Sequence, residues 1–317
     1  MVSRDHLTHS KAIQRRTGAT FHLATRFLPE RARHATYVSY AFFRVADEVV
    51  DDSDPDPSAN QRRDLELIRR GALGDQSARE ELAARGEGTH GADAAPVLTA
   101  FDELRHVAGI DEREVNVFID AMKRDVEATD YADHAELSTY LRGSSVAVAN
   151  MMLAVMEPEN LEAARPHAKA LAEAFQLTNF LRDVREDVVE YDRVYLPRSS
   201  LATHGTDTAA VRRLEPTPAL RATVQDELRR TEELYRDGVA GIQYLPTDCQ
   251  PAVLLAAVLY ADHHRLIRDR DYDVLTATPQ LGTLRKVWLC GRTWWHWRWT
   301  HDPEAVFEAV SAVGTAE

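Results

Sequence analysis

Apolar residues recur at helical spacing along almost the whole of this 317-residue chain. Segments rich in Ala, Leu, Glu and Arg follow one another, and no run of alternating Val, Ile and Thr residues indicates a strand. The sequence therefore predicts an all-α fold. We expect helices over about residues 19–27, 30–52, 58–85, 95–107, 111–127, 134–156, 160–190, 218–244, 248–270 and 279–312.

The breaks between these segments contain helix-breaking residues, as at Pro29, the Asp/Pro-rich segment 51–57, the Gly-rich stretch 86–91 and the connection 197–217. None of them has the composition of an interdomain linker, and the sequence contains no repeat beyond the two motifs described next. A chain of this length can form one domain or two. We expect a single all-α domain over residues 1–317.

One predicted helix carries a row of polar side chains beside its apolar stripe. Within residues 176–187 (QLTNFLRDVRED) the polar row spans an arc of about 80°. Its members are Gln176, Asn179, Asp183 and Asp187, and the adjoining stripe is Leu177, Leu181, Val184 and Val188. Asp183 and Asp187 form a like-charge i,i+4 pair, which destabilises a helix unless a cation lies between them. Carboxylates one turn apart suit Mg²⁺ shared with a phosphate; the alternative is an ordinary solvated helix edge.

A second helix repeats this arrangement. In residues 40–51 (YAFFRVADEVVD), the side chains of Tyr40, Arg44, Asp47 and Asp51 share an arc of about 60° among apolar neighbours. Asp51 alone could simply begin the acidic loop that follows. Four carboxylates that converged at low dielectric would repel strongly, and they would therefore require several divalent ions. The two motifs together favour a metal-diphosphate site.

Composition indicates a soluble globular protein, because 44% of the residues are hydrophobic and the longest apolar run, residues 251–261, is far shorter than the roughly 20 residues of a membrane span. The N-terminal residues form no apolar signal segment, so we expect a cytoplasmic protein. Cys249 and Cys290 have no ligand-like spacing and are expected to be buried thiols. The sequence indicates no oligomeric state.

The net charge of −13 argues against a nucleic-acid partner. Only 4 of the 38 basic residues are Lys. An acidic surface with little Lys suits a salt-rich cytoplasm, and a biased nucleotide composition explains scarce Lys equally well.

Four stretches resemble the phytoene/squalene synthase family of head-to-head prenyl synthases, and its phytoene synthase branch most of all. They are TFHLATRFLP at 20–29, YAFFRVADEVVD at 40–51, QLTNFLRDVRED at 176–187 with RVYLP at 193–197, and Tyr260 with RLIRDRDYDV at 265–274. The stretches occur in the order found in the family, and the resemblance spans roughly residues 10–290, which is most of the chain.

The resemblance implies a helical bundle of the isoprenoid synthase type with a central substrate cavity. It also implies that two geranylgeranyl diphosphates are joined to phytoene through a cyclopropyl diphosphate, as in carotenoid biosynthesis, with no NADPH. Squalene or dehydrosqualene formation from farnesyl diphosphate is the alternative, and a non-catalytic scaffold of the same fold is a remote one.

The resemblance also implies roles for individual residues. Asp47, Asp51, Asp183 and Asp187 would hold Mg²⁺, or Mn²⁺ in its place. Arg44 and Arg182 would bind phosphate oxygens, Gln176 and Asn179 would orient ligands or water, and Tyr40 and Tyr260 would lie near the carbocation. The apolar stripes beside the polar rows would line a prenyl tunnel.

Several other residues have two readings. Arg142 stands where many relatives carry an aromatic residue, so its contacts are not predicted, and for Gly143, Ser144 and Ser145 close helix packing is favoured over catalysis. Arg285 and Lys286 resemble a basic patch near the substrate entrance of the family, and a solvated helix face is the alternative.

His263 and His264 are neighbours that point about 100° apart on a helix, so they cannot share a metal and are expected to pack. Five Trp residues cluster at 288–299 among Arg residues. Packing of the last helix is the favoured reading, and peripheral contact with a membrane interface is the alternative.

Overall fold

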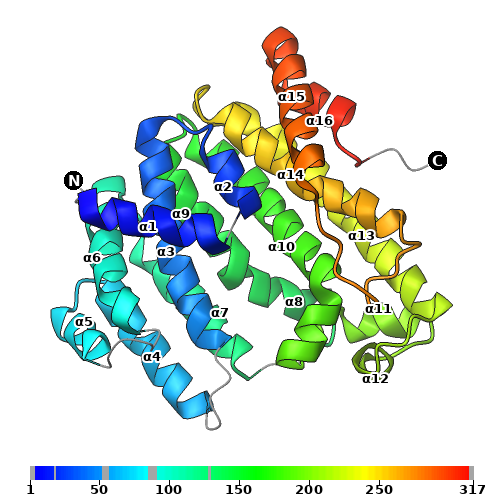
Figure 1. Cartoon of the computed structure of the whole chain (residues 1–317), viewed down its shortest axis with the longest axis horizontal. Helices are drawn as coiled ribbons and strands as arrows, with labels where there is room; N and C mark the ends of the chain where they lie inside the picture. The colour runs from blue at the N-terminus through cyan, green and yellow to red at the C-terminus, as the bar shows by residue number, and fades with distance from the viewer. Residues whose placement is uncertain (1–3, 18, 52–56, 85–90, 128–129, 314–317) are drawn as a thin grey trace. The chain divides into compact units, whose positions relative to one another are not determined.

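The computed structural model describes residues 4–17, 19–51, 57–84, 91–127 and 130–313 (Figure 1). In these residues every regular element is helical, and the β contact that occurs is an isolated bridge between Asp130 and Val194. The predicted all-α fold is confirmed. The chain divides into two compact units, residues 1–127 with 142–157 (unit 1) and residues 128–141 with 158–317 (unit 2). A single domain over 1–317 stays a prediction.

Unit 1 is built around α3, which contacts α1, α4, α6, α7 and α9. Its buried face includes Phe42, whose ring stacks on Phe101 of α6 at 4.0 Å between centroids. Aromatic stacking of this kind adds to the area that the two rings bury. The helices of unit 1 are α1 (Arg4–Thr17), α2 (Ala19–Thr25), α3 (Glu30–Val50), α4 (Pro57–Ala72), α5 (Gln76–Ala83), α6 (Gly91–Ala108), α7 (Glu112–Asp125), the π-helical turn η1 (Arg142–Val146) and α9 (Ala147–Met156).

Residues 142–146 pack tightly against α7. A Cβ at Gly143 would lie 2.4 Å from the Cβ of Ala121 and 2.6 Å from the carbonyl oxygen of Val117, so only glycine allows this approach. Arg142 donates from both terminal nitrogens to the carboxylate of Glu114, each at 2.8 Å. The favoured packing role of Gly143 is confirmed, and Arg142 forms a bidentate ion pair.

Unit 2 is organised by the 31-residue helix α10, which packs along α13 and against α14 (Figure 1). A Cβ at Gly238 of α13 would lie 2.7 Å from the Cα of Leu171, which explains how closely the two helices approach. The helices of unit 2 are α8 (His134–Leu141), α10 (Leu161–Tyr191), α11 (Arg198–Thr203), α12 (Thr208–Arg212), α13 (Pro218–Ala240), the 3₁₀ turn η2 (Gly241–Tyr244), α14 (Gln250–Arg268), α15 (Thr283–Thr300) and α16 (Pro303–Val310).

The chain after α10 folds back onto it. Asp192 adopts a left-handed conformation with φ 52°, and the backbone N–H of Arg193 donates to the carbonyl of Asp187 at 2.9 Å. Residues 194–196 are then buried, and the ring of Tyr195 stacks on Phe180 at 3.8 Å between centroids. The RVYLP segment therefore fixes where α10 ends.

The helices differ from the prediction by three additional helices and by two breaks within predicted segments. Helices α1, α11 and α12 were not expected. The segment 58–85 breaks at Gly74, which has φ 100°, and Asp75 caps the following helix by accepting from the N–H of Ala78. The segment 279–312 breaks at His301, after which Asp302 caps α16. Local turn chemistry outweighs continuous helical periodicity at these two breaks.

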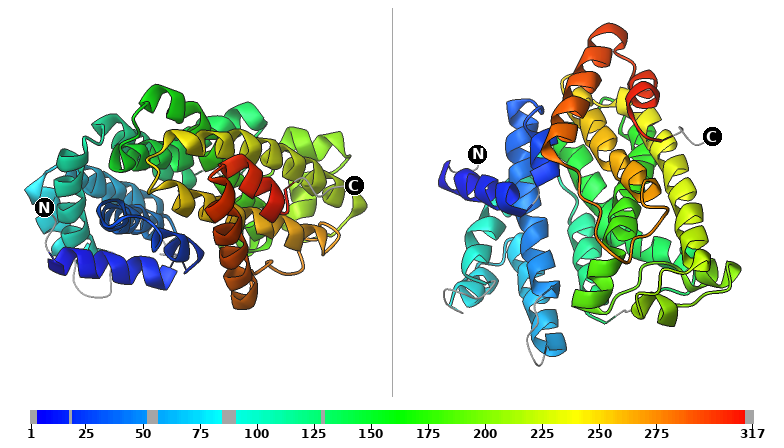
Figure 2. Two further views of the ribbon diagram at one scale, coloured as in Figure 1. Left: turned by 90° about the horizontal axis from the view of Figure 1, so that it is seen from above. Right: turned by 45° about the vertical axis from the view of Figure 1, so that its right-hand side comes forward.

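Helices α15 and α16, the last two of the chain, lie side by side, as both views of Figure 2 show. The prediction that the Trp cluster is packed is wrong for Trp288, Trp294, Trp295 and Trp299, which are 43–70% exposed. The side of α15 that packs is instead the one with Leu289 and Thr293. Cys249 is buried, as predicted, and Cys290 is half-buried. In the part of the chain that the structure describes, no helix has both the length and the apolar character needed to cross a membrane.

Candidate active site

The first polar row lies on α3 in unit 1. Tyr40, Arg44, Asp47 and Asp51 are all half-buried and border the fully buried face of the helix. Asp51 is the C-cap residue, whose N–H donates to the carbonyl of Asp47. The ring of Tyr40 stacks on Phe21 of α2. The polar row therefore follows the face that helical spacing predicted.

The charges around Asp47 are unfavourable for a carboxylate. Burial, and after it the charges of Asp51, Asp125 and Glu48, together raise the pKa of Asp47 to about 7, although Arg44 lowers it. Burial lowers the pKa of Arg44, but Asp47, Glu48 and Asp51 outweigh this effect and leave it above its usual value. Such a crowded carboxylate is a feature of functional sites, where a bound cation relieves the repulsion.

Two residues that support this row were not anticipated. Gln61 of α4 donates from Nε2 to the carbonyl of Val49 at 2.9 Å and to that of Val50 at 3.3 Å, which satisfies carbonyls that the end of α3 leaves open. Asp125 of α7 is buried and adds negative charge near Asp47. Gln61 therefore fixes the end of α3, and Asp125 is a third carboxylate close to the predicted pair.

The second polar row lies on α10 in unit 2. Gln176, Asn179, Asp183 and Asp187 are half-buried. The Oδ1 atom of Asn179 is buried and has no hydrogen-bond partner among the residues that the structure describes. An unpaired buried acceptor costs free energy unless a ligand or water meets it, so this amide is suited to orient a bound group.

The apolar stripe beside this row fills the core of unit 2. Leu181 and Val184 pack with Val194, Leu196 and residues of α13 and the 274–275 segment, and Val188 packs against the same cluster. Protein side chains therefore cover this part of the stripe, which the family resemblance had implied would line a prenyl tunnel.

Basic groups and a tyrosine gather beside Asp183. Arg182 donates from Nε to Oδ1 of Asp183 at 2.7 Å. Burial lowers the pKa of Arg182, but Asp183, and after it Tyr260 of α14 and Glu186, outweigh the burial and raise it. Burial lowers the pKa of Lys286 of α15, and Arg182 lowers it further. The structure therefore places Tyr260 and Lys286 near the predicted phosphate-binding Arg182.

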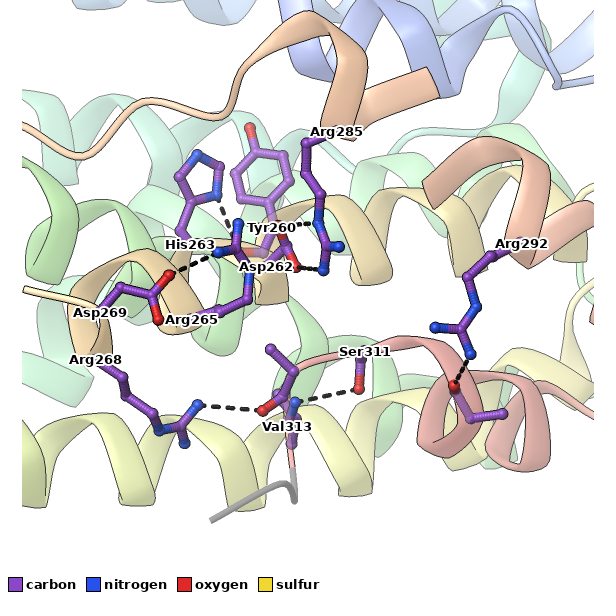
Figure 3. Close-up of polar contacts among 12 residues, drawn as sticks. Tyr260, Asp262, His263, Arg265, Arg268, Asp269, Arg285, Arg292, Ser311 and Val313 are labelled. Atoms are coloured by element: carbon purple, nitrogen blue, oxygen red, sulfur yellow. Dashed lines mark hydrogen bonds and ion pairs between the residues drawn. The ribbon is translucent and has the colours of Figure 1, made fainter. Parts of the chain in front are cut away.

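Arg285, the neighbour of Lys286, is held by the protein itself. It donates to both carboxylate oxygens of the fully buried Asp262, at 3.0 and 2.7 Å (Figure 3). Arg265 also contacts Asp262, at 3.3 Å. Arg285 therefore ties α15 to α14, which neither reading of the basic pair anticipated.

A buried polar network lies behind the row on α10. His264 Nε2 lies 2.9 Å from Thr178 Oγ1, which also lies 2.9 Å from the hydroxyl of Tyr235. His264 Nδ1 lies 3.2 Å from Glu232, and Arg268 pairs with the same carboxylate. Burial lowers the pKa of His264, whereas His264 and Arg268 outweigh burial and lower the pKa of Glu232. His264 is therefore neutral and donates to an ionised Glu232, and the predicted packing role of His264 is confirmed.

His263 makes the protein sensitive to acid. Burial, and after it Arg182, lowers the pKa of His263 to about 4 from 6.5. The unfolded chain gains this proton near pH 6.5 and the folded chain only near pH 4, so the fold loses stability as the pH falls between these values. We expect a loss of about 3 kcal/mol between pH 7 and pH 4 from this group.

The test is urea unfolding of His263→Gln at both pH values, with His34→Gln, at a side chain that is 40% exposed, as the control. The pH-dependent loss should shrink by about 3 kcal/mol in His263→Gln and remain in the control. An unchanged loss in His263→Gln would contradict the role given to burial.

Both carboxylate pairs offer the oxygen donors that Mg²⁺ binds. In unit 1 the raised pKa of Asp47 fits a row of side chains that takes up a cation. In unit 2 the buried Oδ1 of Asn179, which pairs with no described residue, fits a row that meets a polar ligand. Across the described residues, no three His, Cys, Asp or Glu side chains are grouped so that they could hold a metal. A metal here would take its remaining ligands from water and phosphate.

The sequence matches the squalene/phytoene synthase family model over residues 14–285. The chain belongs to this family. It is 30% identical to the phytoene synthase of Thermus thermophilus, across 92% of this chain and 93% of that protein. It is 29% identical to the phytoene synthase of Rhodobacter capsulatus, across 86% of this chain and 77% of that protein.

Solved structures share the fold. A dehydrosqualene synthase with bound ligand has a TM-score of 0.78 at 22% identity, covering 93% of this chain and 97% of its own. A squalene synthase from Alicyclobacillus acidocaldarius has a TM-score of 0.69 at 22% identity, covering 85% and 95%. The predicted isoprenoid synthase fold is confirmed, and membership of the family indicates a prenyltransferase.

Proposed function

We propose that this protein is a Mg²⁺-dependent prenyltransferase that joins two geranylgeranyl diphosphates head to head and forms phytoene through a cyclopropyl diphosphate. The observation that carries the proposal is the repeated pairing of carboxylates with an arginine. Asp47 and Asp51 share a half-buried helix face with Arg44. Arg182 donates to Asp183, which lies one turn before the half-buried Asp187 on α10. The curated relatives that are named phytoene synthases support this choice of product.

The residues of the two rows have distinct tasks in this reaction. Departure of diphosphate leaves a carbocation. The two aspartate pairs would hold metal ions, which would supply positive charge to the leaving group. Arg44 and Arg182 bind phosphate oxygens. Asn179 orients a ligand or water through its unpaired Oδ1, and Tyr260 helps to keep water from the cation.

Farnesyl diphosphate is the alternative substrate, because the solved structures of similar fold include a dehydrosqualene synthase and a squalene synthase. The deciding experiment supplies each diphosphate to the purified protein, with Mg²⁺, Mn²⁺ or EDTA and with or without NADPH, and identifies the hydrocarbon by mass. We expect phytoene from geranylgeranyl diphosphate without NADPH, and none with EDTA. Squalene formed only with NADPH would overturn the proposed reaction, and dehydrosqualene from farnesyl diphosphate would correct the substrate. Absence of diphosphate release from both substrates would favour the scaffold alternative.

Asn179 and Thr178 are neighbours on α10, and substituting each one tests separately an effect on the reaction and an effect on the stability of the core. Asn179→Ala should lower kcat by about 10- to 100-fold with little change in stability, because its Oδ1 has no partner within the protein. Thr178→Ala should instead lower the free energy of unfolding by about 2 kcal/mol, because Tyr235 and His264 lose a buried partner.

Single-turnover kinetics and urea unfolding of both variants measure the two effects. A stability loss in Asn179→Ala with normal turnover would show that this amide serves the fold and not the substrate.

A further inference from the structure

Helix α15 presents an unusual surface to solvent. All five Trp residues of the chain lie on this helix, and Trp294, Trp295 and Trp299 are 58%, 58% and 70% exposed. Leu284 is 87% exposed and Val287 is 63% exposed. Contiguous exposed apolar side chains of this size mark an interaction surface on a soluble protein.

These side chains share one face of α15. At helical spacing Leu284, Val287, Trp288, Trp294, Trp295 and Trp299 fall in an arc of about 140°. Leu289 and Thr293, which are buried, lie on the opposite side. Packing against the rest of unit 2 therefore uses one side of the helix and leaves the more apolar side outward.

The charge of α15 is opposite to that of the protein. The helix carries no acidic residue, in a chain with a net charge of −13. Of its basic residues, Arg292 and Arg298 lie at the apolar face, whereas Arg285 is paired with Asp262 and Lys286 lies on the opposite side of the helix. The Arg292 guanidinium lies 4.8 Å from the centre of the Trp288 ring, and Arg298 lies 5.8 Å from that of Trp294. The first acidic residue after the helix, Asp302, is used to cap α16. A basic, Trp-rich face is complementary to an anionic surface with an apolar interior.

We propose that the outward face of α15, defined by the six apolar residues above, docks this protein onto an anionic lipid bilayer. Trp rings occupy the interface between headgroups and acyl chains, and Arg side chains reach the headgroup phosphates. A second copy of the chain is a poorer partner, because a two-fold contact through this face would bring two basic helices together. The proposal goes beyond the proposed reaction and does not depend on it.

Intrinsic fluorescence tests the proposal directly, because every Trp of the chain reports from α15. The full chain, without substrate, is mixed with phosphatidylcholine vesicles or with vesicles that also contain phosphatidylglycerol. We expect a blue shift and quenching by brominated acyl chains on the anionic vesicles, and sedimentation of the protein with them. No spectral change with anionic vesicles, or equal binding to neutral ones, would overturn the proposal.

Two variants with matched controls identify the face. Trp295→Ser with Trp299→Ser should weaken vesicle binding by at least about tenfold, and Val107→Ser, at a 74% exposed position of α6, should not. Arg298→Glu should weaken binding to anionic vesicles by about tenfold, whereas Arg113→Glu, an exposed residue of α7 with the same change in charge, should have a smaller effect.

Far-UV circular dichroism and urea unfolding show that each variant is folded. Sedimentation equilibrium without lipid is the second readout. A dimer that the Trp295/Trp299 variant dissociates, with no vesicle binding by the parent chain, would overturn the proposal and identify a second copy as the occupant.

Discussion

Asp47→Asn is expected to lower kcat by about 10³-fold and to leave the helices folded. Asparagine keeps the shape of the side chain and loses the negative charge with which Asp47 would bind a divalent cation. A metal ion that Asp47 helps to hold would stabilise the leaving diphosphate in the transition state by several kcal/mol. A 10³-fold loss of kcat corresponds to about 4 kcal/mol of this stabilisation. Turnover of geranylgeranyl diphosphate at saturating substrate and Mg²⁺ measures the effect.

The same substitution should raise the stability of the metal-free protein. The pKa of Asp47 is about 7 in the folded chain and 3.8 as an isolated group. The unfolded chain therefore loses this proton near pH 4, whereas the folded chain keeps it until about pH 7, and the difference favours the unfolded state. This penalty grows as the pH rises from about 4 to about 7 and reaches at most about 4 kcal/mol. Asp47→Asn in EDTA should therefore be more stable than the parent at pH 8, with little difference below pH 4.

Glu103→Gln, at an exposed carboxylate of α6, is the matched control. It should change neither kcat nor the stability of the metal-free protein at pH 8. Asp183→Asn applies the kinetic test to the second pair and should lower kcat as severely. Near-normal turnover in Asp47→Asn or Asp183→Asn would refute the role of that residue in the reaction.

Helical geometry alone explains why the sequence predicted the polar rows. Residues four apart lie on one face of any helix, so Asp47 with Asp51 and Asp183 with Asp187 could be paired without knowledge of the tertiary fold. The structure bears out their placement beside the buried face of each helix.

Contacts between distant parts of the chain could not be predicted in this way. Gln61 holds the end of α3 and Asp125 adds charge near Asp47, yet neither residue belongs to a periodic pattern that points to α3. The exposure of the Trp residues of α15 could not be predicted for the same reason. Trp suits a packed core and an interface equally well, and only the neighbours of a helix decide which face is covered.

The largest stability change is expected at Arg268, which supports the buried network behind α10. Its guanidinium pairs with Glu232, which is 3% exposed, and donates to the carbonyl of Ala312 at 3.1 Å. Arg268→Met keeps much of the volume and leaves Glu232 ionised with only the neutral His264 beside it. Removing one partner of a buried pair typically costs about 3–5 kcal/mol, and we expect a loss of that size at pH 7.

Arg265→Met is the matched control, one turn earlier on α14. Its partner Asp262 is also fully buried but keeps both contacts with Arg285, so this loss should be less than half as large. Urea unfolding at pH 7 gives both values. The double variant Arg268→Met/Glu232→Gln should recover part of the loss, because it removes the isolated charge as well as its partner. Equal losses for Arg265→Met and Arg268→Met, or no recovery in the double variant, would mean that the loss does not come from the charge left on the buried Glu232.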